Sequence, residues 1–432
     1  MTCIYSSFFG PIVEYRRNLF LNSSSSSVTM RIAFIHPRYP TSEGTGAAHS
    51  ATQIVNGLAD VGHEVCVYCT RPPPERTERD GISLRHLDGY SNHPHTPTRQ
   101  NREVESRVDE LTEFDLVHSY LMRLIPSIGE VGKQSDVGTV VTLNAYGGIC
   151  AKNDLRYQDD KQCQSKSIFK CFNCIASTGF HSNEHGYLYE TASQLLSLRL
   201  INSGESRLEF IDGFRAPSTH VRNNYVQFGY DSEKIATIPH PIDEDFSLTH
   251  RSTFSEPYKL LYVGSLSRHK GVQTLVPIME RLNKTEWEFE LTVVGTGELE
   301  RRMHEQVENY DVEDAVQFAG FISNAELPEV YASHDCLIHP SVWEEPLARV
   351  YLEALATETP IVTTDYGCIE EIVGEAGRLA DGTAESFCDT IVNIVESNEL
   401  PEMSVAAGEQ AEQFELSRVI SQLNVLYDTV TE

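Results

Sequence analysis

The sequence predicts an α/β protein with two Rossmann-like domains that face a central cleft. Strand-like and helix-like segments alternate from residue 31 onward, a pattern typical of parallel α/β domains. The alternation restarts after a proline-containing connection at 240–257, which we expect to act as a hinge. Ligands of such domains lie against the carboxyl ends of the strands, which here would line the cleft.

The first expected domain covers residues 30–243. Its predicted elements, in order, are a strand at 31–36, a helix after the Gly44-Thr-Gly46 turn, and strands at 65–69, 115–118, 139–143 and 235–238.

The second expected domain covers residues 258–413, with strands at 260–263, 291–294, 316–319, 336–338 and 361–363. The apolar spacing of residues 414–432 then predicts an amphipathic last helix.

The first 29 residues contain short apolar pieces and the run Ser23–Ser27, without the apolar core of a signal peptide. We expect a disordered extension or an overcalled translation start. Because no apolar run approaches the roughly 18 residues that a membrane span needs, we expect a cytoplasmic protein.

The chain is strongly acidic, with 34 Lys and Arg against 63 Asp and Glu and a formal charge of −29. A surface this negative repels phosphate backbones, so nucleic acid is not an expected partner. Only nine of the basic residues are lysines, a balance that resembles haloarchaeal proteins. An ordinary acidic mesophilic protein is the alternative.

The segment 336–356 carries the most chemistry. A strand ends at Pro340, a loop contains Glu345, and a helix is predicted to begin near Leu347. The first-turn N–H groups of such a helix lack carbonyl partners and suit a diphosphate. These groups belong to Leu347, Ala348, Arg349 and Val350.

Two carboxylates flank this helix start. Glu353, inside the helix, could accept the hydroxyls of a ribose, while Glu345 could meet a sugar. In the alternative reading Glu353 pairs with Arg349 at i,i+4 and Glu345 is merely solvated.

Two Glu separated by seven residues after His339-Pro-Ser341, followed by Ala354-Leu-Ala-Thr-Glu-Thr-Pro-Ile-Val362, resemble the donor signature of family 4 retaining glycosyltransferases of the GT-B fold. The resemblance implies that Glu345 contacts a donor hexose and Glu353 its ribose. It also implies a nucleotide-sugar donor, UDP- or GDP-hexose, and a glycan or lipid-linked acceptor. Transfer would proceed with retention and need no metal cofactor.

The loop after the strand at 260–263 resembles the family's pyrophosphate grip. It contains Gly264, Arg268 and Lys270, and Lys270 would supply charge to the phosphates. The family usually has Arg directly after the first Gly, where this chain has Ser265, and Arg268 would substitute. Alternatively, both cations only solubilise a helix start.

Two glycine turns resemble the family's nucleobase side. These are Val294-Gly-Thr-Gly297, with Gly295 and Gly297, and Phe318-Ala-Gly-Phe-Ile322, where the main chain of Ile322 would bond the base. A dehydrogenase is a poor second reading, since the third Gly of a dinucleotide fingerprint is missing.

On the acceptor side, the turn that ends at Gly46 resembles the family's loop that lies against the diphosphate and acceptor. The segment Asp115-Leu-Val-His118-Ser-Tyr120 resembles the family's Asp-x-Val-His-x-His stretch. Tyr120 replaces the second His, and Asn144 stands where relatives have another. His118 is a catalytic candidate, although a histidine at a strand end is more often structural. GT-B folds also often return the last helix to the first domain.

A separate insertion at 150–174 holds Cys150, Cys163, Cys171 and Cys174. The spacing C-x12-C-x7-C-x2-C suits a structural four-thiolate zinc site. Free or disulfide-linked thiols and an iron–sulfur cluster are the alternatives. Lys152, Lys161, Lys166 and Lys170 lie beside these cysteines, where they would offset zinc thiolates or receive an anionic acceptor such as a lipid phosphate. Placement in an ordinary solvated loop is the alternative. Peripheral contact with the inner membrane face would come through the acceptor.

Three functional classes stay open. A hexosyltransferase is favoured, and a non-catalytic nucleotide-sugar or glycan-binding protein is the main alternative, given Ser265 and the missing histidines. A retaining phosphorylase of the same fold would need phosphate as its acceptor.

Overall fold

The computed structural model describes residues 29–36, 38–40, 46–71, 79–88, 92–158, 161–178, 186–246 and 254–432. Nearly all of the expected N-terminal extension, and Gly44 and Thr45 of the first turn, lie outside the described residues. The expected hinge also includes residues 247–253, which are not described, so the domain boundaries placed there stay a prediction.

The N-terminal unit is built on a parallel sheet of order β3-β2-β1-β4-β5-β8-β9. Its strands are β1 (Arg31–His36), β2 (Glu64–Cys69), β3 (Ile82–His86), β4 (Leu116–Ser119), β5 (Gly138–Thr142), β8 (Gly213–Ala216) and β9 (Ile235–Thr237). The helices of this unit are α2 (Gly46–Asp60), α3 (Thr96–Glu105), α4 (Val108–Leu111), α5 (Ile125–Gln134), α6 (Ile168–Thr178), α7 (Tyr187–Glu205) and α8 (Thr219–Gln227).

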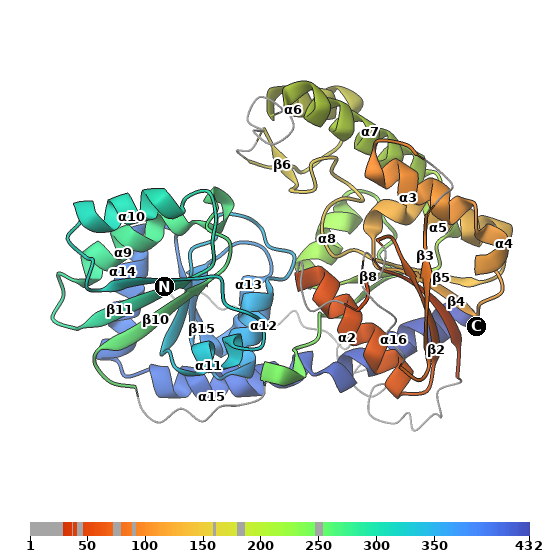
Figure 1. The fold of residues 1–432 in the computed structure, drawn as a ribbon. Helices are drawn as coiled ribbons and strands as arrows, with labels where there is room; N and C mark the ends of the chain where they lie inside the picture. Colours follow the sequence, from red (N-terminus) through yellow and green to blue (C-terminus); the bar gives the residue numbers. More distant parts are fainter. Residues whose placement is uncertain are drawn as a thin grey trace, which may run out of the picture.

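The C-terminal unit repeats this architecture with a parallel sheet of order β12-β11-β10-β13-β14-β15. Its strands are β10 (Tyr258–Val263), β11 (Phe289–Val294), β12 (Val316–Gly320), β13 (Cys336–His339), β14 (Ile361–Thr364) and β15 (Gly377–Ala380). The helices are α9 (Leu275–Leu282), α10 (Glu300–Asn309), α11 (Leu327–Ala332), α12 (Arg349–Ala356), α13 (Ile369–Val373), α14 (Ala384–Glu396) and α15 (Leu400–Ala411). The two sheets confirm the predicted fold class, and Figure 1 shows the units side by side.

The insertion contains the short hairpin β6 (Arg156–Tyr157) and β7 (Lys161–Gln162), followed by α6. Figure 1 shows α6 and α7 rising from the N-terminal unit, with β6 beneath α6 on the side that faces the C-terminal unit. This position lets the insertion reach across to the other unit.

The last helix, α16 (Leu416–Thr431), leaves the C-terminal unit and packs beside α2 on the first sheet (Figure 1). Its buried face joins the core that contains Met30 and Ile32 through Val419, Ile420, Leu423, Leu426 and Tyr427. Contact is close, because a Cβ at Gly57 of α2 would lie 2.7 Å from Ile420 Cγ1. The chain thus crosses between the units twice.

Replacement of Leu423 by Ala should lower the free energy of unfolding by about 2–5 kcal/mol, because the side chain is fully buried and a cavity would remain. Val425 lies on the same helix but is 45% exposed. Val425→Ala is therefore the matched control and should change stability by less than about 0.5 kcal/mol. Urea unfolding followed by circular dichroism measures both, and equal midpoints would contradict the packing of α16 in this core.

Candidate active site

The carboxyl ends of β12, β11, β10 and β13 meet at one edge of the C-terminal sheet, as in any parallel sheet. Main-chain hydrogen bonds tie the loops that follow them: Gly264 N donates to Val294 O (3.0 Å), and Gly295 N donates to Gly320 O (2.7 Å). Gly295 has φ +128°, and a Cβ there would lie 1.9 Å from Gly264 O. The predicted glycines therefore let these loops approach each other.

Gly297 has a related role, because a Cβ on it would meet Leu266 O at 2.5 Å. Ile322 follows β12, is half-buried, and packs against the apolar cluster that also holds Leu347 and Ala348. The loops expected on the nucleobase side and the loop before α12 thus share one core.

Lys270 and Glu345 form an ion pair at this edge, with Lys270 Nζ donating to Glu345 Oε1. The Glu345 side chain is only 6% exposed and that of Lys270 19%, and the ammonium lies 5.9 Å from the centre of the Trp343 ring. Glu345 is therefore not merely solvated, which was the alternative reading. A carboxylate this buried needs a charged partner, and Lys270 supplies it.

Arg268 lies in the same short turn as Lys270, two residues before it. It lines an open cavity of about 920 Å³ together with His269, Trp343 and two further arginines, Arg156 and Arg302. Arg156 and Asp154 come from the insertion, so the cavity lies where the insertion meets the C-terminal unit. Asp154 and Glu298 also line it, so the three arginines share the cavity with two carboxylates.

Glu353 has two partners in the structure. Its Oε1 lies 3.4 Å from Arg349 Nε, and its Oε2 accepts a hydrogen bond of 2.9 Å from Tyr331. The i,i+4 pair with Arg349, which belonged to the alternative interpretation of Glu353, is therefore present. Helix α12 begins at Arg349, two residues later than expected, so Leu347 and Ala348 precede the helix while Val350 lies in its first turn.

Arg349 also connects the two units. Its Nη1 donates to Ser50 Oγ of α2 (2.9 Å), and its Nη2 lies 3.9 Å from Asp243 Oδ2. A Cβ at Gly46 would lie 2.5 Å from Arg349 Cδ, so Gly46 makes room for this side chain at the start of α2. The structure thus gives Gly46 an arginine as its neighbour, where the sequence predicts a diphosphate.

Asp243 is part of the same contact, since its Oδ2 accepts a hydrogen bond from His49 Nε2. Burial opposes ionisation of Asp243, but the hydrogen bond from His49 and the charges of His49 and Arg349 hold its pKa below the usual value. Asp243 is therefore an ionised link between α2, the connection and α12.

His118 is fully buried and both of its ring nitrogens have partners. Nδ1 lies 2.6 Å from Tyr427 Oη of α16, and Nε2 lies 2.8 Å from Thr142 Oγ1. Burial, aided by the charge of Arg215, lowers its pKa well below the usual value. These contacts favour a structural role for His118, and we assign it no catalytic role.

The sequence did not single out Glu344, which holds the loop that carries Glu345 against the N-terminal unit. Its Oε2 accepts hydrogen bonds from His220 Nε2 (2.9 Å) and from Gln162 Nε2 of the insertion (2.6 Å). Trp343 Nε1 donates to Asp154 O at 3.3 Å. The sequence shows that Glu344 stands next to Glu345. No local pattern indicates that Glu344 has partners 124 or more residues away.

All four cysteines of the insertion line one cavity of about 30 Å³. Burial raises the pKa of the Cys171 thiol, and the electrostatic effect of the neighbouring Cys163 and Cys174 also raises it. Among the described residues, however, no three His, Cys, Asp or Glu side chains are grouped closely enough to hold a metal ion as they stand. The zinc site predicted from the spacing is therefore not preformed.

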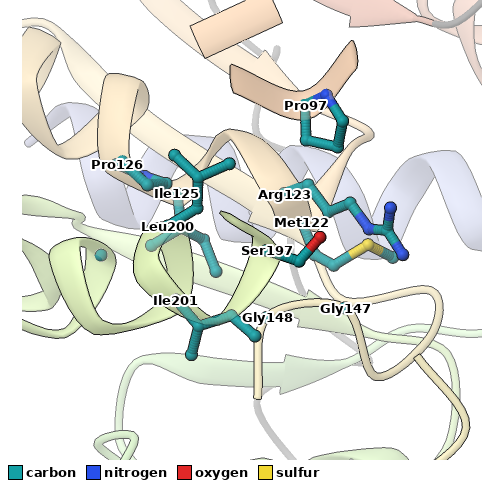
Figure 2. A pocket seen from close by; sticks show the side chains of 11 residues that line it. Pro97, Met122, Arg123, Ile125, Pro126, Gly147, Gly148, Ser197, Leu200 and Ile201 are labelled. Carbon is teal, nitrogen blue, oxygen red and sulfur yellow. The ribbon is translucent and has the colours of Figure 1, made fainter. Parts of the chain in front are cut away.

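A cavity of about 20 Å³ lies between α5, α7 and the turn before Cys150, where Figure 2 shows Arg123 beside Gly147 and Gly148. This cavity is too small for a sugar, so it is not the site of a nucleotide sugar. Burial lowers the pKa of Arg123, while the neighbouring Cys150 opposes that shift. Arg123 thus adds a buried cation next to the insertion.

In the part of the chain that the structure describes, no helix is both long and apolar enough to cross a membrane.

Known proteins resemble this chain over most of its length or over part of it. The uncharacterized glycosyltransferase MJ1607 of Methanocaldococcus jannaschii is 24% identical over 359 residues, which covers 80% of this chain and 83% of that protein. The glycogen synthase of Mycobacterium tuberculosis is 33% identical over 153 residues, 35% of this chain and 37% of the relative.

Solved structures show the same fold. Anabaena HepE in complex with UDP superposes with a TM-score of 0.65 at 18% identity, covering 91% of this chain and 98% of that chain. WaaG, a glycosyltransferase of lipopolysaccharide biosynthesis, gives 0.63 at 18% identity, with coverage of 91% and 98%.

Two family models match consecutive parts of the sequence. The model of a glycosyl transferase 4-like domain matches residues 45–241, and the model of glycosyl transferases group 1 matches residues 246–414. These matches run almost without a break over both parallel sheets, so each unit is similar to a glycosyltransferase domain and the two units together have the GT-B fold.

Proposed function

We propose that the protein transfers a hexosyl group from a nucleotide sugar to a hydroxyl of a glycan or lipid-linked acceptor, with retention of configuration. The observation that carries the proposal is the buried Lys270–Glu345 pair at the carboxyl edge of the C-terminal sheet. It offers a cation for phosphate oxygens and a carboxylate for sugar hydroxyls at one point.

The departing nucleoside diphosphate carries the charge that develops in the transition state. Lys270 and the first-turn N–H groups of α12 stabilise this charge, and preorganised groups of this kind are the largest single source of acceleration in many enzymes. Because these groups neutralise the diphosphate, the proposed chemistry needs no divalent metal. The donor displaces Lys270 partly from Glu345, which then accepts hydrogen bonds from the hexose.

UDP- and GDP-hexoses are the proposed donors, and the HepE structures in complex with UDP and UDP-glucose support the first of them. Glu353, held by Tyr331 and Arg349, is the proposed ribose acceptor. The acidic, lysine-poor composition supports work at high salt, so assays belong in concentrated KCl as well as in dilute buffer.

The acceptor is proposed to approach through the insertion. Large apolar side chains are exposed on the neighbouring helices α6 and α7: Ile168 (70%), Phe169 (89%), Phe172 (56%), Leu188 (81%) and Tyr189 (53%). Lys161 precedes α6 in the sequence, and Lys170 lies within α6 between Phe169 and Phe172. Exposed aromatic groups beside cations suit peripheral contact with an anionic lipid surface that holds a lipid-linked acceptor.

Lys270→Gln should lower kcat by about 100-fold or more, because the amide can still donate to Glu345 but cannot neutralise the leaving diphosphate. Hexose release from UDP- and GDP-hexoses, with and without acceptor, measures the effect. The matched control is Lys284→Gln, whose ammonium pairs only with Glu280 on the surface of the same unit. Donor binding without any turnover in the wild-type chain would instead favour the non-catalytic alternative.

Glu353→Gln should weaken UDP or GDP binding by about tenfold, because the ribose hydroxyls lose a charged acceptor while Tyr331 keeps a partner. Isothermal titration calorimetry gives the affinity. The exposed Glu370 of α13 provides the control variant Glu370→Gln. If both variants bind nucleotide like the wild type, Glu353 is only the ionic partner of Arg349.

The double variant Phe169→Ser/Phe172→Ser should lose binding to phosphatidylglycerol vesicles, since each exposed ring contributes about 1.5–3 kcal/mol when buried. Vesicle co-sedimentation is the measurement. Val405, 63% exposed on α15, gives the control Val405→Ser. Equal sedimentation of wild type and double variant would remove this surface from the proposal.

A further inference from the structure

The open cavity of about 920 Å³ between the insertion and the C-terminal unit has the size of a ligand site. Its walls contain three arginines: Arg156 from the insertion, Arg268 from the turn after β10, and Arg302 from α10. In the part of the chain that the structure describes, neither Arg268 nor Arg302 forms an ion pair. Both guanidinium groups are therefore available to a ligand.

The cavity keeps a positive balance although two carboxylates also line it. Asp154 is already paired, because its Oδ2 lies 3.2 Å from Lys152 Nζ and its Oδ1 accepts a hydrogen bond of 3.0 Å from Arg156 N. The three guanidinium groups thus face one remaining carboxylate, that of the exposed Glu298. The planar fork of a guanidinium matches a carboxylate or a phosphate with two parallel hydrogen bonds, so this wall favours an anion.

An indole ring forms another part of the wall. Trp343 Nε1 donates to Asp154 O at 3.3 Å, and the ring meets the His269 ring edge-on with the two centroids 5.8 Å apart. These contacts hold the ring in a fixed position at the cavity. An apolar ring beside a few polar groups is typical of small-molecule sites and suits the C–H face of a sugar.

The cavity lies apart from the proposed diphosphate site. Helices α9 and α10 pack on one face of the C-terminal sheet, in the apolar cluster that contains Leu260 and Tyr262 of β10. Helix α12 packs in the cluster that contains Leu261 and Val263. Because neighbouring residues of a strand point to opposite faces, the cavity beside α10 and the start of α12 are on different sides of the sheet.

The wall of the cavity is bonded to the loop that carries Glu345. Val342 N donates to His269 O at 3.1 Å, and Trp343 stands two residues before Glu345. Lys270, next to His269, pairs with Glu345. A ligand in the cavity therefore adjoins the carboxylate that we assign to the donor hexose, where an acceptor has to lie.

We propose that this cavity binds the acceptor of the hexosyl transfer by an anionic group, which is the carboxylate of a uronic acid or the phosphate of a phosphorylated sugar. Arg156, Arg268 and Arg302 supply the cations, and Trp343 supports the sugar ring. The anion takes no part in the transfer and only positions the hydroxyl that attacks. As an acceptor site, the cavity rests on the proposed hexosyl transfer.

The experiment titrates the full chain, without donor, with methyl glucuronide, glucose-6-phosphate and the neutral methyl glucoside. Isothermal titration calorimetry in dilute buffer, where salt screens charges least, gives the affinities. At least one acidic sugar should bind about tenfold or more tightly than the neutral glucoside, and the tighter of the two identifies the anion.

Arg302→Gln should remove this preference, because the amide lacks the charge and the fork of the guanidinium. The matched control is Arg301→Gln on the same helix, whose guanidinium is 92% exposed and pairs with Glu305, and it should keep the preference. Circular dichroism on heating checks that both variants stay folded. Equal binding of all three sugars by the wild type, or the same preference in Arg302→Gln, would overturn the acceptor site.

Two further measurements separate the acceptor site from the proposed function. Inorganic phosphate that binds as tightly as glucose-6-phosphate would reduce the cavity to an anion site without a sugar and overturn the inference. Transfer from a nucleotide sugar to neutral glycans, with the same acceptor KM in wild type and Arg302→Gln, would overturn the inference but leave the proposed function standing. Acidic sugars that bind at Arg302 in a chain without transfer would overturn the proposed function but leave the sugar site in place.

Discussion

The ion-paired contact around Arg349 is the interaction on which the geometry of the site depends. One guanidinium meets Glu353 in its own helix, Ser50 in α2 and Asp243 in the connection between the two sheets. It is only 10% exposed, so the charges act at short range and salt screens them weakly. Gly46 and His49 complete the contact from the N-terminal unit. The start of α12, where a diphosphate would lie, is thus set by residues of both units.

The architecture could be predicted from the sequence because its signals are local. Strands β1, β2, β10 and β11 are short apolar runs followed by helical spacing, and each was expected within a residue or two of its observed position. The strands β3, β8 and β15 were not expected. β3 is an edge strand with half-exposed residues, and β8 contains Arg215, which is fully buried beneath Tyr120 and donates to Ile238 O. A charged residue in a four-residue strand gives no apolar pattern to detect.

Residue types and their spacing predict which side chains belong to the site, but they do not predict which of these side chains contact each other. Glu345 and the lysine before Gly271 lie together, but their direct bond requires contact between two loops whose paired residues are 75 positions apart in the sequence. His118 shows the opposite case, since the motif offered a catalytic group while the return of α16 places Tyr427 against it. Partners such as Glu344 with Gln162 and His220 depend on tertiary packing, which no local pattern encodes.

The carboxylate of Glu344 couples the insertion to the loop that carries Glu345. It is held by the insertion and by α8, and its neighbour along the chain is the carboxylate assigned to the donor sugar. A ligand that shifts the insertion therefore changes the energy of the donor loop, and the effect must operate equally in the other direction. In the proposed function, occupancy of the donor site at Glu345 and of the acceptor site at the insertion is therefore linked through one side chain, which would give a physical basis for ordered binding and for holding the activated sugar idle until an acceptor arrives.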